Sequence, residues 1–271
     1  FPGIFEHGNR SIITPQEIDL YSDKHKLGIE VNGLYWHSNI DKNYHINKTN
    51  KCTEKDIQLL HFWDTEIENN FDLVKSMIAS RLGKSNRKIY ARKCYIALVD
   101  NETRRKFEKE NHLQGDGNST VNLGLYLETN LFPELVSIMT FAKPRFNKKY
   151  DWELIRFCSL KYTNVIGGAS KLFKYFLDHY EGNIITYANR RFSQGNLYKQ
   201  LGFTNMGCSA PNYWYVIDGN LVSRNRCQKH KLKKILGDKF NSELSESENM
   251  LSAGYHRIFD CGNMVFAYER K

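Results

Sequence analysis

The alternation of apolar and polar positions near the start of the chain predicts a β-hairpin. Two short apolar runs, 18–21 and 27–31, flank a polar turn at 22–26. Each run carries one acid in its middle, Asp19 in the first and Glu30 in the second. Carboxylates seldom interrupt half-buried strands unless a cation pairs with them. Two converging carboxylates suit a hard divalent cation such as magnesium, and the alternative is a surface hairpin with solvated acids.

A helix and a third strand are predicted after the hairpin. Residues 44–56 (YHINKTNKCTEKD) predict a helix on which His45 and Lys48 form an i, i+3 pair that can face the hairpin. The apolar run 57–62 predicts a strand that completes a parallel βαβ unit. His37 lies just past the second strand. These three basic residues are candidates for work beside a metal, and solvated side chains are the alternative.

The second half of the chain has its own pattern of elements. Residues 69–82 predict an amphipathic helix whose apolar face includes Phe71, and the basic stretch 84–93 marks the expected domain boundary. The glycine-rich turn at 164–170 (NVIGGAS) precedes a helix, which predicts an anion-binding arrangement of backbone N–H groups. Beyond the boundary the pattern predicts helices at 103–111, 171–179 and 193–201 and strands at 121–127, 135–141, 153–158, 184–187 and 213–217. Together the elements predict an α/β (α+β) fold.

The composition limits which classes of binding partner and which cellular compartment are expected. The chain has 271 residues and a formal net charge of +9, which favours nucleic acid first and an acidic membrane surface second. No run approaches the roughly 18 apolar residues of a membrane span, and no signal-like segment opens the chain. Because the chain begins with Phe1 rather than Met, we expect that an upstream segment has been removed. The six scattered cysteines favour buried thiols in a reducing cytoplasm over a zinc site.

Cations gather in the tail at 222–239, beside the aromatic run 213–215. Lysine and arginine contribute sequence-independent affinity for phosphates, and aromatic rings stack on bases or wedge between them. A solvated basic helix is the alternative for the tail, and a place in the core is the favoured alternative for Trp36. The expected DNA contacts are Trp36, Lys88, Arg92, Arg190, Arg191, Arg224, Arg226, Lys229 and Lys231.

Residues 12–82 resemble a known nuclease family. The blocks EIDLY, KLGIEVNGLYWHS, YHINKTNKC and IQLLHFWDTE occur in this order. They resemble the catalytic module of phage homing endonucleases of the EDxHD type (Hef-like). That module is similar to the very-short-patch repair endonuclease of the PD-(D/E)XK superfamily. The resemblance implies a mixed sheet flanked by helices. It also implies cleavage of duplex DNA with Mg²⁺, or Mn²⁺ as a substitute, in the cytoplasm of a phage-infected bacterium.

The same resemblance assigns roles to individual residues. It implies catalytic roles for Asp19, Glu30, His37, His45 and Lys48, metal binding by Asp19 and Glu30, and auxiliary roles for Glu17 and Asp64. Either His37 or His45 matches the histidine near the scissile phosphate, with Asp64 as its orienting partner. Asn32 stands where the superfamily usually has a lysine. Either Lys48 or a histidine then takes over that role, and the general base stays open.

Residues 95–215 resemble a second family. NVIGGAS and the later SQGNLYKQLGF are similar to motifs of GNAT-type acyltransferases, in which the first holds the pyrophosphate of acyl-coenzyme A. Asn164 departs from the usual leading Gln or Arg, so we expect no small-molecule cofactor and a DNA-binding role for this GNAT-like fold. The predicted domains are a nuclease domain at 1–90, a GNAT-like domain at 91–217 and a basic extension at 218–271.

The sequence therefore predicts a site-specific DNA endonuclease, and a homodimer is compatible with it. One alternative is an acyltransferase that modifies DNA or protein, with the N-terminal module as a targeting device. The other is a non-catalytic DNA-binding protein with a decayed nuclease site.

Overall fold

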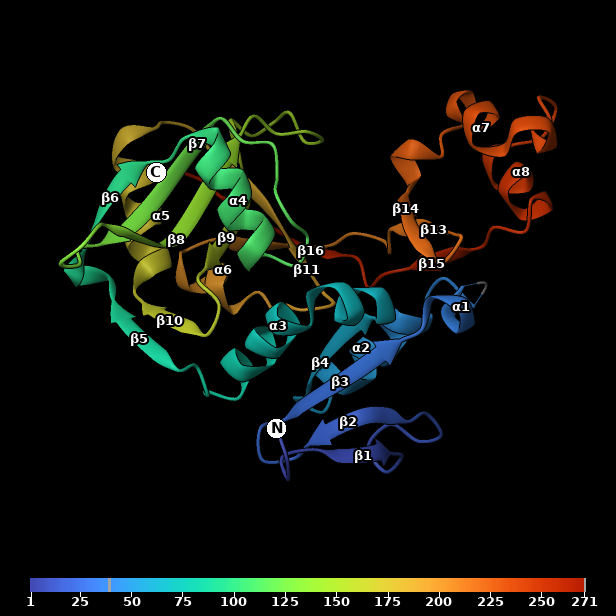
Figure 1. The fold of residues 1–271 in the computed structure, drawn as a ribbon, viewed down its shortest axis with the longest axis horizontal. Helices are drawn as coiled ribbons and strands as arrows, with labels where there is room; N and C mark the ends of the chain where they lie inside the picture. The colour runs from blue at the N-terminus through green and yellow to red at the C-terminus, as the bar shows by residue number, and fades with distance from the viewer. Residues whose placement is uncertain (39, 271) are drawn as a thin grey trace. The chain divides into compact units, whose positions relative to one another are not determined.

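The computed structural model describes residues 1–38 and 40–270, and it has the predicted α/β fold, with mixed sheets flanked by helices (Figure 1). The chain divides into two compact units. The first comprises Phe1–Asn69, Asn189–Phe192 and Ser209–Asn263, and the second comprises Asn70–Ala188, Ser193–Cys208 and Met264–Lys271. This division runs across the three expected ranges, because the expected C-terminal extension contacts the N-terminal module.

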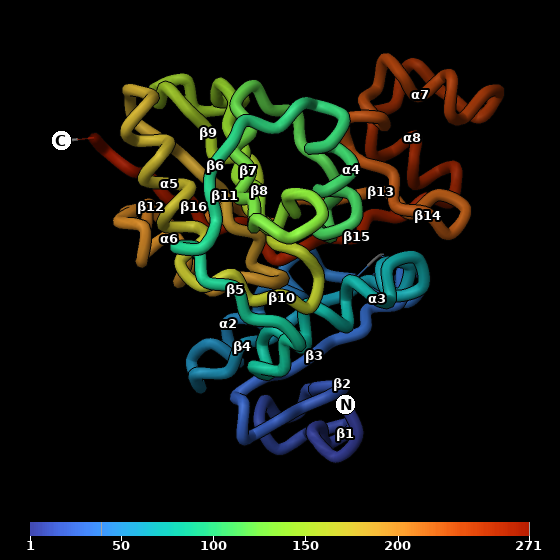
Figure 2. Tube along the Cα trace, turned by 60° about the vertical axis from the view of Figure 1, so that its left-hand side comes forward, coloured from blue at the N-terminus to red at the C-terminus, as the bar shows by residue number. Residues whose placement is uncertain are grey.

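A four-stranded sheet organises the first unit. Its strands are β1 (Glu6–Asn9), β2 (Ile18–Ser22), β3 (Leu27–Asn32) and β4 (Gln58–Trp63), in the order β1-β2-β3-β4. β2 and β3 pair antiparallel, as the hairpin prediction requires, and β3 and β4 pair parallel along their whole length. β2, β3 and β4 can be followed in blue in both views (Figures 1 and 2).

Helix α2 (Tyr44–Thr53) connects β3 to β4 and confirms the predicted βαβ unit. Its inner face is buried although His45, Lys48 and Thr49 on it are polar, and Ile46 and Cys52 are its apolar members. Cys52 joins a cluster of buried apolar residues with the strands: Ile13, Ile18, Tyr21, Ile57 and Leu59. The apolar half of this layer therefore holds α2 on the sheet, and its polar half is buried beside the two acid-bearing strands.

Two helices start at the ends of β3 and β4. α1 (Leu34–His37) follows β3 almost directly, and α3 (Asp64–Arg81) follows β4 without a gap. The helix predicted at 69–82 therefore begins earlier, and its backbone breaks at Asn70, where the first unit gives way to the second. Phe71, expected on the buried face, is 63% exposed, because it follows this break.

The remainder of the first unit is a small three-stranded sheet with two helices. β13 (Tyr213–Ile217) lies between β14 (Asn220–Ser223) and β15 (Arg257–Phe259), antiparallel to both. α7 (Lys229–Leu236) and α8 (Glu246–Ser252) cover it through a core of Tyr215, Cys227, Leu232, Leu236 and Met250. Ile258 of β15 joins a second buried cluster with Leu34 and Trp63, so this layer is continuous with the four-stranded sheet.

A seven-stranded sheet forms the second unit. Its order is β12 (Thr204–Cys208), β16 (Asn263–Tyr268), β11 (Ile184–Asn189), β9 (Trp152–Ser159), β8 (Glu134–Ala142), β7 (Val121–Leu127) and β6 (Cys94–Leu98). The strands predicted at 121–127, 135–141, 153–158 and 184–187 are confirmed. Helices α4 (Asn101–Asn111), α5 (Gly168–His179) and α6 (Asn196–Gln200) accompany the sheet, and α6 is shorter than predicted.

A separate pair of strands corrects the prediction of a glycine-rich turn at 164–170. β5 (Arg87–Tyr90) pairs parallel with β10 (Thr163–Ile166). Half of the stretch predicted as a glycine-rich turn is therefore strand, because β5 supplies it with a hydrogen-bonding partner. The turn itself narrows to Gly167, whose φ of 77° is in the left-handed region that glycine tolerates.

None of the helices in the described part of the chain has the length and hydropathy to cross a bilayer.

Candidate active site

The side chains of Asp19 and Glu30 converge across the hairpin. The β2–β3 register pairs Leu20 with Ile29, which sets these two acids opposite one another one step along. Val31 N donates to Asp19 Oδ2 at 2.7 Å, and Asp19 N lies 3.3 Å from Glu30 Oε1. Each carboxylate therefore reaches the backbone of the other strand. Glu30 is only 2% exposed, whereas Asp19 is partly open to solvent.

Lys48 reaches this pair of acids from α2, as predicted. Its Nζ lies 2.5 Å from Glu30 Oε2, and both side chains are buried. Burial raises the pKa of Glu30 to about 7, an effect that Lys48 opposes and Asp19 reinforces. One ammonium group therefore does not balance the two carboxylates and the loss of hydration. A further cation would favour the ionised form of Glu30.

His37 and His45 form a pair beside the acids. Nδ1 of His37 lies 3.0 Å from Nε2 of His45, and the two rings stack. His45 is 1% exposed and meets the ring of Trp63 edge-on, whereas His37 is partly exposed. Burial lowers the pKa of His37, with Lys48 adding to the effect, and burial lowers the pKa of His45 to about 3. Both rings are neutral at pH 7, and His37 is the outer member of the pair.

His61, which was not among the residues predicted from the sequence, continues this polar layer inward. It is fully buried in β4, and its Nε2 lies 2.8 Å from Thr49 Oγ1. That hydroxyl in turn lies 3.3 Å from Cys261 Sγ. Burial lowers the pKa of His61 well below its ordinary value. Its signal was visible, because His61 interrupts an apolar strand just as the two acids do.

Asn32 contributes its side chain to this inner layer. Its Nδ2 donates to the carbonyl of Phe62 at 3.4 Å and lies 3.5 Å from Nδ1 of His61. Lys48 is thus the basic residue that the structure brings to Glu30.

The two auxiliary acids have other contacts. Asp64 accepts hydrogen bonds from the backbone N–H groups of Leu34 and Thr65, at 2.9 and 2.7 Å. It therefore anchors the start of α1, the helix that carries His37, instead of hydrogen-bonding to a histidine ring. Glu17 pairs with Arg10 at 2.8 Å on the surface. Its expected role beside the metal is not supported by this contact.

One expected DNA contact is wrong. Arg191 is 3% exposed, and its guanidinium makes two hydrogen bonds of 2.8 Å to the carboxylate of Glu66. The same group lies over the rings of Trp63 and Phe192. Because its charge is paired and its faces are covered, Arg191 is a structural residue of the first unit.

The other expected DNA contacts are at least partly open to solvent. Trp36 is 78% exposed, so its favoured place in the core is wrong, and it contacts the equally exposed Tyr35 edge to face. Arg190 is partly exposed and donates to Asn50 at 2.6 Å. The remaining candidates are all exposed: Lys88, Arg92, Arg224, Arg226, Lys229 and Lys231.

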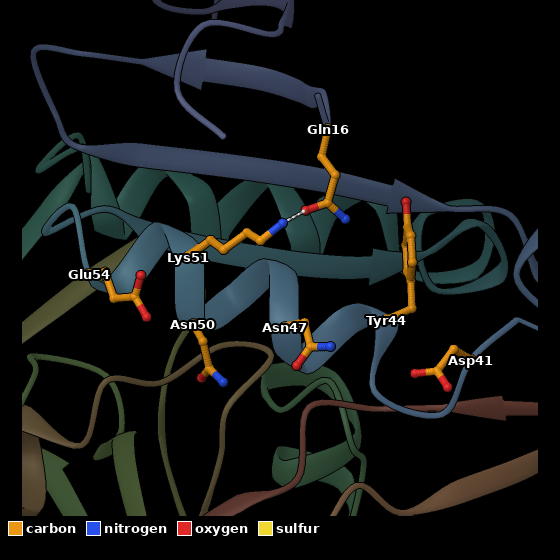
Figure 3. A pocket seen from close by; sticks show the side chains of 7 residues that line it. All are labelled: Gln16, Asp41, Tyr44, Asn47, Asn50, Lys51 and Glu54. Carbon is orange, nitrogen blue, oxygen red and sulfur yellow. Dashed lines mark hydrogen bonds between the residues drawn. The ribbon is translucent and has the colours of Figure 1, made fainter. Parts of the chain in front are cut away.

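A polar cavity of about 420 Å³ opens on the outer face of α2. It is lined by Gln16, Asp41, Tyr44, Asn47, Asn50, Lys51 and Glu54, and Figure 3 shows Lys51 reaching Gln16. The inner face of the same helix carries His45 and Lys48. The cavity therefore lies on the opposite side of α2 from the acids and is not part of the candidate site.

Comparison with models of known protein families finds none that matches the chain, and no curated protein matches it in sequence. The site is therefore judged on its own donors. In residues 1–38 and 40–270, no group of three or more His, Cys, Asp and Glu side chains is arranged to hold a metal ion. The metal donors that this site can offer are the carboxylates of Asp19 and Glu30. Within the described residues, Oδ1 of Asp19 accepts no hydrogen bond. Such a donor set fits Mg²⁺, which keeps several waters and binds through one or two carboxylates plus substrate phosphate.

Proposed function

We propose that this chain is a metal-dependent endonuclease that hydrolyses phosphodiester bonds of duplex DNA. The observation that carries the proposal is the convergence of Asp19 and Glu30 on adjacent strands with Lys48 against them. A buried carboxylate whose pKa is raised toward neutrality, next to a second carboxylate, is typical of a functional site. The resemblance of residues 12–82 to phage homing endonucleases agrees with this chemistry.

Asp19 and Glu30 would hold Mg²⁺, which when bound supplies Lewis acidity toward the scissile phosphate. Lys48 lies where its ammonium can offset negative charge that builds on the phosphate during the reaction. The hydrogen bond to His45 occupies Nδ1 of His37 and leaves Nε2 for exchanging a proton with the attacking water or the leaving oxygen. General acid–base help of this kind contributes about 10²–10⁴-fold.

The charge distribution supports DNA as the substrate. The net charge is +9, and the surface around α7 exposes Arg224, Arg226, Lys229 and Lys231. Trp36, one residue from His37, exposes an apolar ring that suits contact with bases. We place this activity in the cytoplasm of a phage-infected bacterium.

Incubation of the full chain with supercoiled plasmid and with phage DNA tests the proposal. We expect nicked or linear products with Mg²⁺ or Mn²⁺ and none with EDTA. Asp19→Ala protein purified in the same way is the control for contaminating nucleases. Equal cleavage by wild type and Asp19→Ala would refute the assignment of the site. DNA binding without cleavage would favour the non-catalytic alternative, and acyl transfer in a separate incubation with acyl-coenzyme A would favour the acyltransferase.

A further inference from the structure

Two loops of the second unit expose a phenylalanine to the same degree but differ in charge. Phe146, between β8 and β9, is 81% exposed, and Phe132, between β7 and β8, is 80% exposed. Residues 143–149 (KPRFNKK) contain four cations and no acid, whereas residues 128–134 (ETNLFPE) contain two acids and no cation. An exposed ring among cations fits a polyanion with apolar surface, and an exposed ring among acids does not.

The loop at 143–149, called the Phe146 loop below, is held by hydrogen bonds on both sides of its ring. Before the ring, Arg145 N donates to Glu153 Oε2 at 3.0 Å. After the ring, Lys149 N donates to Asn147 Oδ1 at 3.2 Å. Because its backbone is tied in this way, the loop loses less conformational freedom when it binds a partner.

The four cations of the Phe146 loop have different surroundings. Lys143 Nζ lies 4.9 Å from the ring centroid of Trp152, and Lys148 donates to a main-chain carbonyl within the loop. Arg145 and Lys149 are exposed, and within the described residues neither forms a salt bridge. These two side chains are therefore available to backbone phosphates.

We infer that the Phe146 loop is a contact surface for duplex DNA. Arg145 and Lys149 bind phosphates on the duplex backbone, and Phe146 makes apolar contact in the minor groove between them. The inference rests on the proposed function only in taking DNA as the partner, because binding does not require cleavage. It adds a contact in the GNAT-like region to those expected from the sequence.

Binding of the full chain to a fluorescent duplex in EDTA, measured over a series of KCl concentrations, tests the inference. We expect the double variant R145Q/K149Q to reduce the slope of log K against log salt by about two. We expect Phe146→Ala to weaken binding on the order of ten-fold with the slope unchanged. Phe132→Ala is the matched control and should bind like wild type. All of these positions are exposed, and thermal melting checks that each variant is folded.

An unchanged slope in R145Q/K149Q, or equal loss in Phe132→Ala and Phe146→Ala, would overturn the inference. A change in sedimentation without a change in DNA binding would also overturn it, because the loop would then contact another copy of the chain. Cleavage in Mg²⁺ separates this test from that of the proposed function. A wild type that binds through the loop but does not cut refutes the endonuclease alone, and loop variants that bind and cut normally refute the loop alone.

Discussion

Glu30 in the first unit and Glu108 in the second are both buried acids with a basic partner, yet their surroundings differ. Glu30 is 2% exposed and pairs with Lys48, and Glu108 is 0% exposed and pairs with Arg104. Glu108 also accepts hydrogen bonds from Gly117 N and Thr140 Oγ1, so its own unit supplies three donors. Glu30 accepts one hydrogen bond from Lys48 and a longer one, of 3.3 Å, from the backbone N–H of Asp19.

The comparison separates a structural acid from a candidate ligand. Buried polar groups are normally satisfied by their own chain, as Glu108 is. Glu30 instead has a second carboxylate, Asp19, beside it and a pKa raised to about 7. The hydrogen bonds of Glu108 stabilise the fold. The two carboxylates at Glu30 instead carry negative charge that a cation from outside the chain could balance.

The largest expected effect is on the two acids of the first unit. Asp19→Ala or Glu30→Ala should reduce cleavage below detection while leaving DNA binding largely intact, because in the proposed reaction the carboxylates would contact the metal and not the duplex. Gel assays with plasmid DNA and anisotropy with a labelled duplex measure the two properties. Full loss of binding together with cleavage would place these acids in the fold instead of the reaction.

His37→Gln should lower the maximal rate of cleavage about 10²–10⁴-fold, because it would remove the proposed proton-transfer group and keep a side chain of similar size. The pKa of His37 is lowered from its ordinary value, so the ring stays neutral and able to accept a proton at pH 7. Single-turnover rates at saturating DNA measure the effect. An unchanged rate would show that neither nitrogen of His37 takes part in the reaction.

Lys48→Met should slow cleavage about 10²–10³-fold, as loss of one donor to a developing negative charge does. It should also move the acid limb of the pH profile upward, because Lys48 lowers the pKa of Glu30 and its removal lets that pKa rise above about 7. In wild type, raising Mg²⁺ should move the same limb to lower pH, since the cation competes with the proton. Both shifts are measured from the rates of cleavage between about pH 5 and 9. An acid limb that shifts neither in Lys48→Met nor with the Mg²⁺ concentration would contradict the proposed role of Glu30 as a metal ligand.

Glu108→Gln should have the smallest effect on cleavage and the largest on stability. Breaking a buried ion pair costs about 3–5 kcal/mol, because Arg104 would lose its buried carboxylate partner and keep only the longer ion pair with Asp116 at 3.8 Å. Urea unfolding measures the loss, and Glu110→Gln, at an exposed position of the same helix, is the control. Loss of cleavage by folded Glu108→Gln protein would break the distinction between the two acids.

Local patterns predicted most of what surrounds the candidate site. The hairpin, α2 and β4 follow from apolar periodicity, and Lys48 from helical spacing. Arg191 could not be placed in this way, because its partner Glu66 is 125 residues away and a buried arginine looks like an exposed one in sequence. The exposure of Trp36 was predicted wrongly for a related reason, because the local sequence does not show whether distant residues cover its ring.

The same limit explains the errors in the second half. β10 depends on β5, which lies far from it in sequence, and local pattern alone assigned these residues to a turn. The buried layer around His61 was within reach, because a histidine between Leu60 and Phe62 breaks an apolar run. Elements that depend on near neighbours were thus predicted, and contacts that depend on distant ones were not.

The most direct test is a Mn²⁺ titration of the metal-free full chain, followed by electron paramagnetic resonance of the free ion. We expect that wild type and Glu108→Gln bind the ion and that Asp19→Ala and Glu30→Ala do not. Equal binding by wild type and the Asp19→Ala and Glu30→Ala variants would show that the acids of the hairpin hold no metal, and the proposed reaction would lose its basis.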